Sequence, residues 1–495
     1  MTSSYQAELA PVPDWREGAP ALHTPKVHGA GRSTPFLFAV PATGERPLTY
    51  AVEGLPAGLC LDPDTGFIAG RAATAGEYDL RLRASNNHGS DEAEMRLVIG
   101  GSLALTPPLG WNSWNCWGGK VNADHIRAAA NGMVDSGLRA RGYTYVNIDS
   151  SWQGERHGPL NAIQGNHKFP DMKSLVDHIH GLGLKAGIYS TPWTTAWGGD
   201  NLLGESSGAN TGVECELPEY ICQGRYVGEK KHEEDDARQW AQWGFDYLKY
   251  DWRLCDPPST RRMRQALDAS GRDFVFSITT EARIEHAGSW TELTNLWRRN
   301  EDTTDTWESV CANGFHTTGV WEPHTGPGHW FDADMLVLGR LGWGDVRENR
   351  LTVDEQMTHM TLWSLLASPL FLGCDLQSLD DLTLRLVANE DVLAINQDPL
   401  GIQGYCVREV RRGDGKGGAM AHERVYAKPL ADGGTAVGLF NLADEPAEIA
   451  LCFADLGLEG SHPVRNLWTR TDLAPASGGL SFDVPAHGAR LYHIR

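Results

Sequence analysis

The chain has 495 residues, of which 41% are hydrophobic and 22% are charged, as is usual for a soluble globular protein. This length is too great for a single hydrophobic core and predicts about three domains. The formal net charge of −21 argues against nucleic acid or an anionic membrane surface as a partner, because binding either one needs a basic face.

Residues 1–34 are rich in Pro, Ala, Gly and Ser, which predicts a loosely ordered lead-in. The first residues, MTSSYQAELAPVPDW, lack the basic and apolar regions of an export signal, and no run reaches the roughly 18 apolar residues of a membrane span. As written, the chain is expected to be cytoplasmic; it would be secreted or periplasmic if an export segment has been trimmed.

Residues 35–103 contain short alternating strands separated by turn signals, the pattern of a β-sandwich. The stretch LPAGLCLDPDTGFIAGRAATAGEYDLRLRASNNHGS resembles the immunoglobulin-like modules of bacterial surface and carbohydrate-active proteins. No residue in it suggests catalysis, so we expect a spacer or docking module.

Residues 104–400 contain eight strand-like runs that alternate with helical or irregular segments, which predicts a (β/α)8 barrel. The runs are PLGWNSW, YTYVNID, GLKAGIYS, FDYLKYD, DFVFSI, NLWRRN, WFDADMLVLG and SPLFLGCD. The acidic, Gly-rich stretch 200–235 fits no barrel unit and is expected to be a long loop after the third strand. Residues 401–495 alternate without helices and predict an antiparallel β domain, with a hairpin at 432–440.

Cysteine spacing gives no sign of a metal site. The nine Cys residues are scattered, and no pair has the spacing of zinc ligands, so we expect neither metal nor organic cofactor. Cys215 and Cys222 could close a local disulfide loop, which the sequence leaves open.

Polar and aromatic residues collect where the barrel strands end, which is where such barrels build their active sites. Successive strand ends carry Trp111 and Trp114, Asp149 and Ser150, Lys249 and Asp251, Arg298 with the following Asp302, and Asp332 with Asp334. Lys249 and Asp251 are two apart on one strand and should share a face.

Two carboxylates about 5 Å apart are the groups that catalyse glycoside hydrolysis with retention of configuration. Asp251 suits the nucleophile, since Lys249 should keep it ionised. Asp302 suits the acid/base, since a loop residue can reach both the leaving group and water. Glu301 and Asp305 remain alternatives for the acid, and Asp332 and Asp334 are expected to support these residues from behind.

The motifs PPLGWNSWNCWGG, YVNIDSSWQ, FPDMKSLVDHIHGLGLKAGIYS, WGFDYLKYDW, WRRNEDTTDTWESV, GPGHWFDADMLVLG, LLASPLFLGCDL and VLAINQDPLGIQGY resemble glycoside hydrolase family 27 over about residues 104–495. This family contains α-galactosidases and α-N-acetylgalactosaminidases. The resemblance implies a retaining exo-acting α-galactosidase with Asp251 as nucleophile and Asp302 as acid/base. It further implies that Trp114 stacks on the sugar, and that hydroxyl groups are bound by Asp149 (positions 4 and 6), Lys249 (position 3 or 4) and Arg298 (position 2).

The sequence departs from the family pattern around the sugar. Ser150 stands where a second Asp is usual, Arg253 replaces a Cys, and Trp197 lies where that Cys has its disulfide partner. Arg253 is expected either to bind the substrate or to neutralise neighbouring carboxylates. The residues that usually face position 2 are replaced by Thr279 and Thr280.

These departures leave the glycone open. A β-L-arabinopyranosidase, an α-N-acetylgalactosaminidase and an α-1,6-glucan-acting enzyme remain alternatives, and a non-catalytic sugar-binding protein is a remote one. The expected partner is an oligosaccharide or polysaccharide, not nucleic acid or a membrane, and a homo-oligomer remains open.

Overall fold

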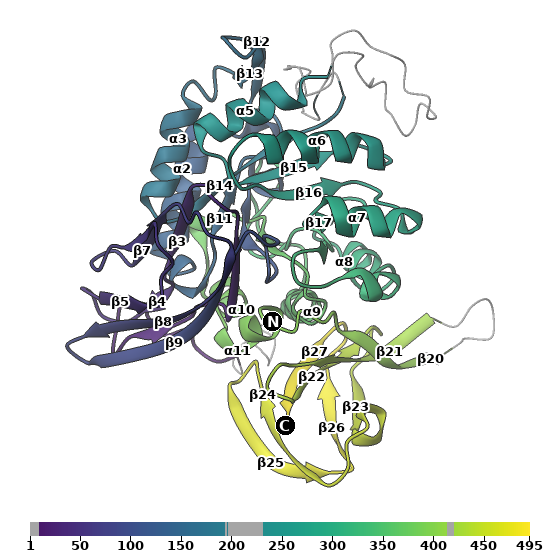
Figure 1. The fold of residues 1–495 in the computed structure, drawn as a ribbon. Coiled ribbons are helices and arrows are strands. Elements are labelled where there is room, and N and C mark those ends of the chain that lie inside the picture. Colours follow the sequence, from purple (N-terminus) through teal and green to yellow (C-terminus); the bar gives the residue numbers. More distant parts are fainter. Residues whose placement is uncertain (1–8, 194–195, 197–230, 413–419) are drawn as a thin grey trace.

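The computed structural model describes residues 9–193, 196, 231–412 and 420–495, which form three successive regions (Figure 1). Two small β-sheets lie beside a barrel of alternating strands and helices, and a C-terminal pair of antiparallel sheets packs on the barrel. The predicted fold class of immunoglobulin-like module, (β/α)8 barrel and C-terminal β-sandwich is confirmed. The predictions for Trp197, for Cys215 and Cys222, and for most of the loop 200–235 lie outside the described residues.

The N-terminal module is a sandwich of a four-stranded and a three-stranded sheet. The first has the order β2 (Val27–Ala30), β9 (Gly89–Ile99), β8 (Gly76–Asn86), β5 (Thr49–Glu53), and the second β3 (Phe36–Ala39), β7 (Phe67–Gly70), β6 (Leu59–Leu61). Alternate residues of β8 (Leu80, Leu82 and Ala84) are buried in the core between the sheets, as the period-2 pattern predicts.

The predicted lead-in 1–34 is more ordered than its composition suggests. Strand β1 (Ala21–Leu22) pairs with β4 (Ala42–Thr43), and β2 pairs in parallel with β9 at the edge of the four-stranded sheet. Such short strands show too few alternations to be recognised among Pro and Gly. Pairing with a distant strand supplies the hydrogen bonds that local sequence does not signal.

Eight parallel strands form the barrel in the predicted positions. In sheet order they are β18 (Trp330–Phe331), β17 (Leu296–Trp297), β16 (Val275–Thr279), β15 (Tyr247–Asp251), β14 (Lys185–Ser190), β11 (Tyr145–Asn147), β10 (Leu109–Asn112) and β19 (Leu370–Leu372). A parallel bridge between Leu336, just after β18, and Leu372 in β19 closes the sheet on itself.

The barrel helices cover the outside of these strands (Figure 1). They are α1 (Trp114–Trp117), α2 (Ala123–Asp135), α3 (Met172–Gly181), α5 (Glu233–Trp243), α6 (Pro257–Ala269), α7 (Ala287–Leu293), α8 (Trp307–Gly314), α9 (Val353–Leu365), α10 (Asp381–Val387) and α11 (Glu390–Asn396). A hairpin of β12 (Gln153–His157) and β13 (Ala162–Gly165) follows the second strand. The predicted loop 200–235 is wrong at its end, where helix α5 begins at Glu233. The acidic first turn of this helix suits its positively polarised N-terminus.

The C-terminal domain has a six-stranded and a two-stranded antiparallel sheet. The first has the order β20 (Tyr405–Arg412), β21 (Met420–Pro429), β22 (Thr435–Asn441), β27 (Ala489–Ile494), β24 (Ser461–Asn466), β25 (Thr471–Ser477), and the second β23 (Ala447–Cys452), β26 (Gly479–Val484). The hairpin predicted around 432–440 is confirmed by the β21–β22 pairing. Helix α9 is buried on all sides over Glu355–Leu365, because β22 and β27 cover the face that the barrel does not.

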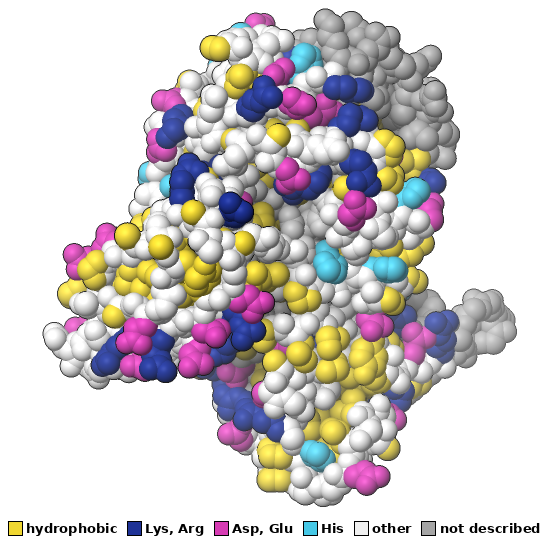
Figure 2. Space-filling model, viewed as in Figure 1, with side chains coloured by type: hydrophobic (Ala, Val, Ile, Leu, Met, Phe, Trp, Pro, Cys, Tyr) yellow, Lys and Arg dark blue, Asp and Glu magenta, His cyan; other side chains and the backbone are white. Residues whose placement is uncertain are grey.

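On the face shown in Figure 2, acidic and basic side chains are interspersed. Among the described residues, no helix combines the length and the hydrophobicity that crossing a bilayer requires.

Candidate active site

The barrel interior changes from apolar to polar along the strands. Its lower layer is an apolar cluster with Tyr145, Tyr247, Val275, Leu296 and Phe371. Two residues further along the same or neighbouring strands, the inward positions are polar, and a small cavity of about 20 Å³ is lined by Asn147, Lys249, Ser277 and Arg298. Because alternate strand residues share a face, the chain that builds the core also places these groups at the barrel mouth.

Asp251 ends β15 and is held by two hydroxyl groups. The Tyr189 hydroxyl donates to its Oδ2 at 3.0 Å, and the Thr280 hydroxyl donates to its Oδ1 at 3.4 Å. Burial raises the pKa of Asp251 to about 6, although Lys249 and Arg298 act in the opposite direction. Lys249 favours the ionised form of Asp251, as expected, but burial outweighs it, and the net pKa lies above the usual value.

Lys249 forms its ion pair with Asp149. Its Nζ lies 2.8 Å from Asp149 Oδ2, which also accepts from Asn112 Nδ2 at 2.9 Å, while the Ser150 amide donates to Oδ1 at 2.8 Å. Burial alone would lower the pKa of Lys249, but Asp149 and Asp251 outweigh it and raise this pKa. Three donors therefore fix the orientation of the Asp149 carboxyl group at the mouth.

Arg298 connects the two proposed catalytic regions. Its Nη2 donates to Asp302 Oδ1 at 2.7 Å and to Thr280 Oγ1 at 3.0 Å, and its Nη1 to Asp334 Oδ1 at 2.5 Å. Thr280 in turn contacts Asp251, so one buried guanidinium and one hydroxyl link the two carboxylates. The Asp302 side chain is 54% exposed, whereas that of Arg298 is 3% exposed.

Asp332 and Asp334 line the same small cavity as Lys249 and Arg298. Asp334 accepts from Arg298 and, at 2.6 Å, from the Thr303 amide, so it anchors both the guanidinium and the loop that carries Asp302. Burial and the charge of Asp334 raise the pKa of Asp332 to about 7. The Asp334 amide also donates to Asp332 Oδ1 at 2.8 Å. That the two residues support the catalytic pair remains a prediction.

The remaining predicted residues surround this centre. Trp114 packs on the apolar layer and stays partly exposed. Ser150 is buried, and its hydroxyl has no partner among the described residues. Arg253 pairs with Glu301, and Thr279 is buried with its hydroxyl 3.2 Å from that of Thr280.

Sequence reasoning missed Tyr189 and gave Thr280 no contact to Asp251. Tyr189 is the second-last residue of β14, and Thr280 directly follows β16. Their place near a strand end was therefore the available signal. Asp305, an alternative acid, is buried and bound by Arg347 and Arg350 at 2.6 and 2.7 Å, and its pKa is lowered to about 2. A carboxyl so firmly ionised is a poor proton donor.

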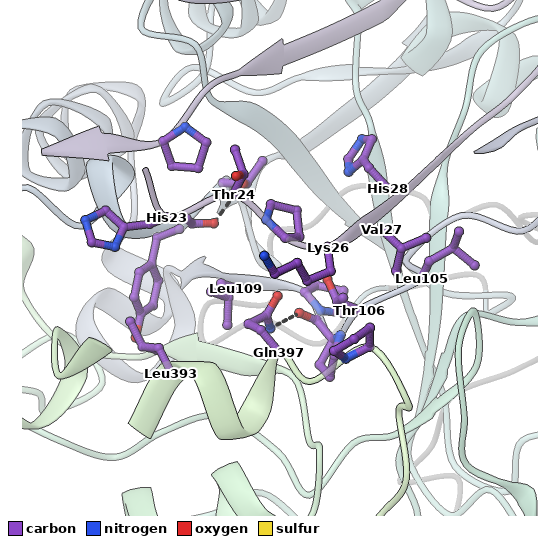
Figure 3. Close-up of a pocket in the computed structure, with 18 of the residues that line it drawn as sticks. His23, Thr24, Lys26, Val27, His28, Leu105, Thr106, Leu109, Leu393 and Gln397 are labelled. Carbon is purple, nitrogen blue, oxygen red and sulfur yellow. Dashed lines mark hydrogen bonds between the residues drawn. The ribbon is translucent and has the colours of Figure 1, made fainter. Parts of the chain in front are cut away.

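A cavity of about 720 Å³ lies at the opposite end of the barrel (Figure 3). It is lined by His23, Lys26 and His28 of the N-terminal module and by Gln397 beyond α11. Cavity size alone therefore does not locate the catalytic centre. Among the described residues, no group of three or more His, Cys, Asp or Glu side chains is placed to hold a metal ion.

The raised pKa of Asp251 predicts that this residue costs stability at neutral pH. The carboxyl titrates near 3.8 when unfolded and near 6 when folded, so the cost is absent below about pH 4, grows between these values and is complete above about pH 6. Two pKa units correspond to at most about 3 kcal/mol. We expect Asp251→Asn to stabilise the protein by about 1–3 kcal/mol near pH 7.5 and by little near pH 4, measured by thermal unfolding. An equal effect at both pH values would contradict this.

Three family profiles match successive parts of the chain. The profile described as "Alpha galactosidase A" matches residues 106–200 and 202–398, "Alpha galactosidase C-terminal beta sandwich domain" matches 422–494, and "Putative Ig domain" matches 19–100. An α-galactosidase of Cyamopsis tetragonoloba is 34% identical over 83% of this chain and 92% of its own.

Two solved structures extend the comparison. A protein of Bacteroides fragilis described as a "putative alpha-galactosidase/melibiase" has a TM-score of 0.85 and 33% identity, with 97% of this chain and 99% of its own covered. A GH27 β-L-arabinopyranosidase of Geobacillus stearothermophilus has a TM-score of 0.67 and 29% identity, over 79% of this chain and 96% of its own. The chain belongs to the α-galactosidase family of glycoside hydrolases, family GH27.

Proposed function

We propose that this chain is a retaining exo-acting α-galactosidase that removes terminal α-D-galactosyl residues from oligosaccharides. The observation that carries the proposal is the linked pair of carboxylates at the mouth of the barrel, in a chain of the α-galactosidase family. A relative that is 34% identical over most of its length is described as an α-galactosidase.

Asp251 is the proposed nucleophile. Its two hydroxyl donors orient the carboxylate, and above about pH 6 it is ionised and able to attack the anomeric carbon. The attack forms a covalent glycosyl-enzyme and breaks the bond to the leaving oxygen.

Asp302 is the proposed acid/base. Its side chain is 54% exposed and so is accessible to a leaving group, while Arg298 fixes one of its oxygens. It gives its proton to the leaving oxygen in the first step, and in the second it takes a proton from the water that attacks the anomeric carbon.

The sugar's hydroxyl groups are assigned to the rigid charges around this pair. The ion-paired Asp149 and Lys249 are assigned to positions 3, 4 and 6, and Arg298, which pairs with Asp302, is assigned to position 2. Trp114 supplies an apolar face for the ring.

A β-L-arabinopyranosidase is the second candidate, because β-L-arabinopyranose is α-galactose without the C6 group. Asp149 already accepts from three protein donors, and the short side chain of Ser150 adds no second carboxylate for a hydroxyl at C6. A binding site that makes few contacts with C6 would discriminate weakly between the two sugars.

The test is hydrolysis of matched nitrophenyl α-D-galactoside and β-L-arabinopyranoside, with the first-formed anomer followed by proton NMR. We expect turnover of the galactoside with the α-anomer formed first. A larger kcat/KM on the arabinopyranoside would favour the second candidate. A first-formed β-anomer, or no turnover of either sugar or of the N-acetylgalactosaminide, would reject the proposal.

A further inference from the structure

An ion pair at the barrel mouth joins the two loops that carry the proposed catalytic residues. Arg253 lies two residues after Asp251, and Glu301 directly precedes Asp302. The Arg253 guanidinium donates to a carboxylate oxygen of Glu301; the two side chains are 21% and 63% exposed. Arg253 is therefore held over the mouth by a partner that belongs to the acid/base loop.

The rest of that loop is fixed through its backbone. Asn313 Nδ2 donates to the Glu301 carbonyl at 3.0 Å, and the Thr303 amide donates to Asp334. The Asp302 carboxylate, in contrast, accepts from one side chain among the described residues, Arg298, and is half exposed. The position and charge of this carboxylate thus depend on few groups, so one charged neighbour can change both.

Charged groups from three neighbouring parts of the barrel act on Asp302. Arg298 follows β17, Lys249 and Asp251 lie on β15, Asp334 follows β18 and neutralises part of Arg298, and Arg253 lies in the loop after β15. Partial desolvation would raise the pKa of Asp302, but Arg298, Lys249 and Arg253 outweigh it and lower this pKa.

We propose that Arg253 and Glu301 are a positioning pair that holds the acid/base loop over the nucleophile and sets the pH at which Asp302 gives up its proton. This rests on the proposed function. Arg253 supplies positive charge that favours the carboxylate of Asp302, and Glu301 offsets part of that charge. The balance between the two, more than either alone, fixes the protonation midpoint.

The proposal predicts opposite effects for the two halves of the pair. Arg253→Met leaves the Glu301 anion beside Asp302, so the upper pH midpoint of kcat/KM should rise by about half a pH unit. Glu301→Gln leaves Arg253 unneutralised, so the midpoint should fall by a similar amount. The double variant should return close to the wild-type midpoint, since both charges are gone. The midpoint belongs to the coupled carboxyl pair, and these directions hold for it as a whole.

The measurement is the pH profile of nitrophenyl α-galactoside hydrolysis, with Arg261→Met and Glu292→Gln as matched controls. That exposed pair joins α6 and α7 at 2.8 Å and should leave the midpoint unchanged. If the wild type is active but the midpoints stay fixed, or move in the same direction in both single variants, the inference is wrong. The proposed function would then still stand. An inactive wild type would reject the proposed function together with the inference.

Discussion

Asp251→Gly should lower turnover of an aryl α-galactoside by about 10⁴-fold or more, because no other group on its strand can attack the anomeric carbon. The vacated space borders Tyr189 and Thr280, whose hydroxyl groups bind the native carboxylate. Azide should enter it and attack the sugar from the same face. The product, identified by NMR, should be β-galactosyl azide, with inverted configuration.

Asp246→Asn is the matched control for this variant. Asp246 directly precedes β15 at the opposite end of the barrel, where it pairs with Arg272 at 2.6 Å and His180 at 2.8 Å. Its loss should reduce stability without changing the kcat of the folded enzyme. If azide gave no azido sugar with Asp251→Gly while the protein remained folded, Asp251 would not be the nucleophile.

The barrel was predictable from sequence because its strands carry their own signals. Each is a short apolar run that ends in a polar residue, and in β15 the alternation already separates Leu248 and Tyr250, which face the helices, from Tyr247, Lys249 and Asp251, which face inward. Since such barrels place strand ends at one mouth, the same pattern also predicted which side chains would lie together.

Pairing between those side chains was not predictable in the same way. Lys249 could have paired with Asp251 two residues away, but a cross-strand carboxylate, Asp149, takes its ammonium group. Arg253 and Glu301 are 48 residues apart, and nothing local indicates that they meet. Strand β2 was not predictable for the same reason, because its hydrogen-bond partner is β9, far along the chain.

The protonation order of the two carboxyls also needed the structure. Sequence suggested an ionised nucleophile and a protonated acid, whereas burial raises the pKa of Asp251 and the surrounding cations lower that of Asp302. A sugar that covers the exposed side of Asp302 would remove water from it and raise its pKa. Substrate binding would thereby favour the protonated form of Asp302, the proposed acid.

Asp302→Ala should separate substrates by their leaving group. Galactosides with alkyl leaving groups need protonation as the bond breaks, so their kcat/KM should fall by about 10²–10⁴-fold. Dinitrophenyl galactoside releases dinitrophenolate, which needs no proton, so the kcat/KM for this substrate should change little. Its kcat should still fall, because the glycosyl-enzyme on Asp251 has lost the base that activates water. Steady-state kinetics on a series of leaving groups measures both effects.

Azide provides the stereochemical counterpart of the Asp251→Gly experiment. With Asp302→Ala it should attack the glycosyl-enzyme from the side that Asp302 has vacated and give α-galactosyl azide, with retained configuration. Glu301→Gln and Asp305→Asn test the alternative acids and should show no steep dependence on the leaving group. Were Asp302→Ala to slow all substrates equally and Glu301→Gln to discriminate among them, the acid would be Glu301, because a missing proton donor affects only leaving groups that need the proton.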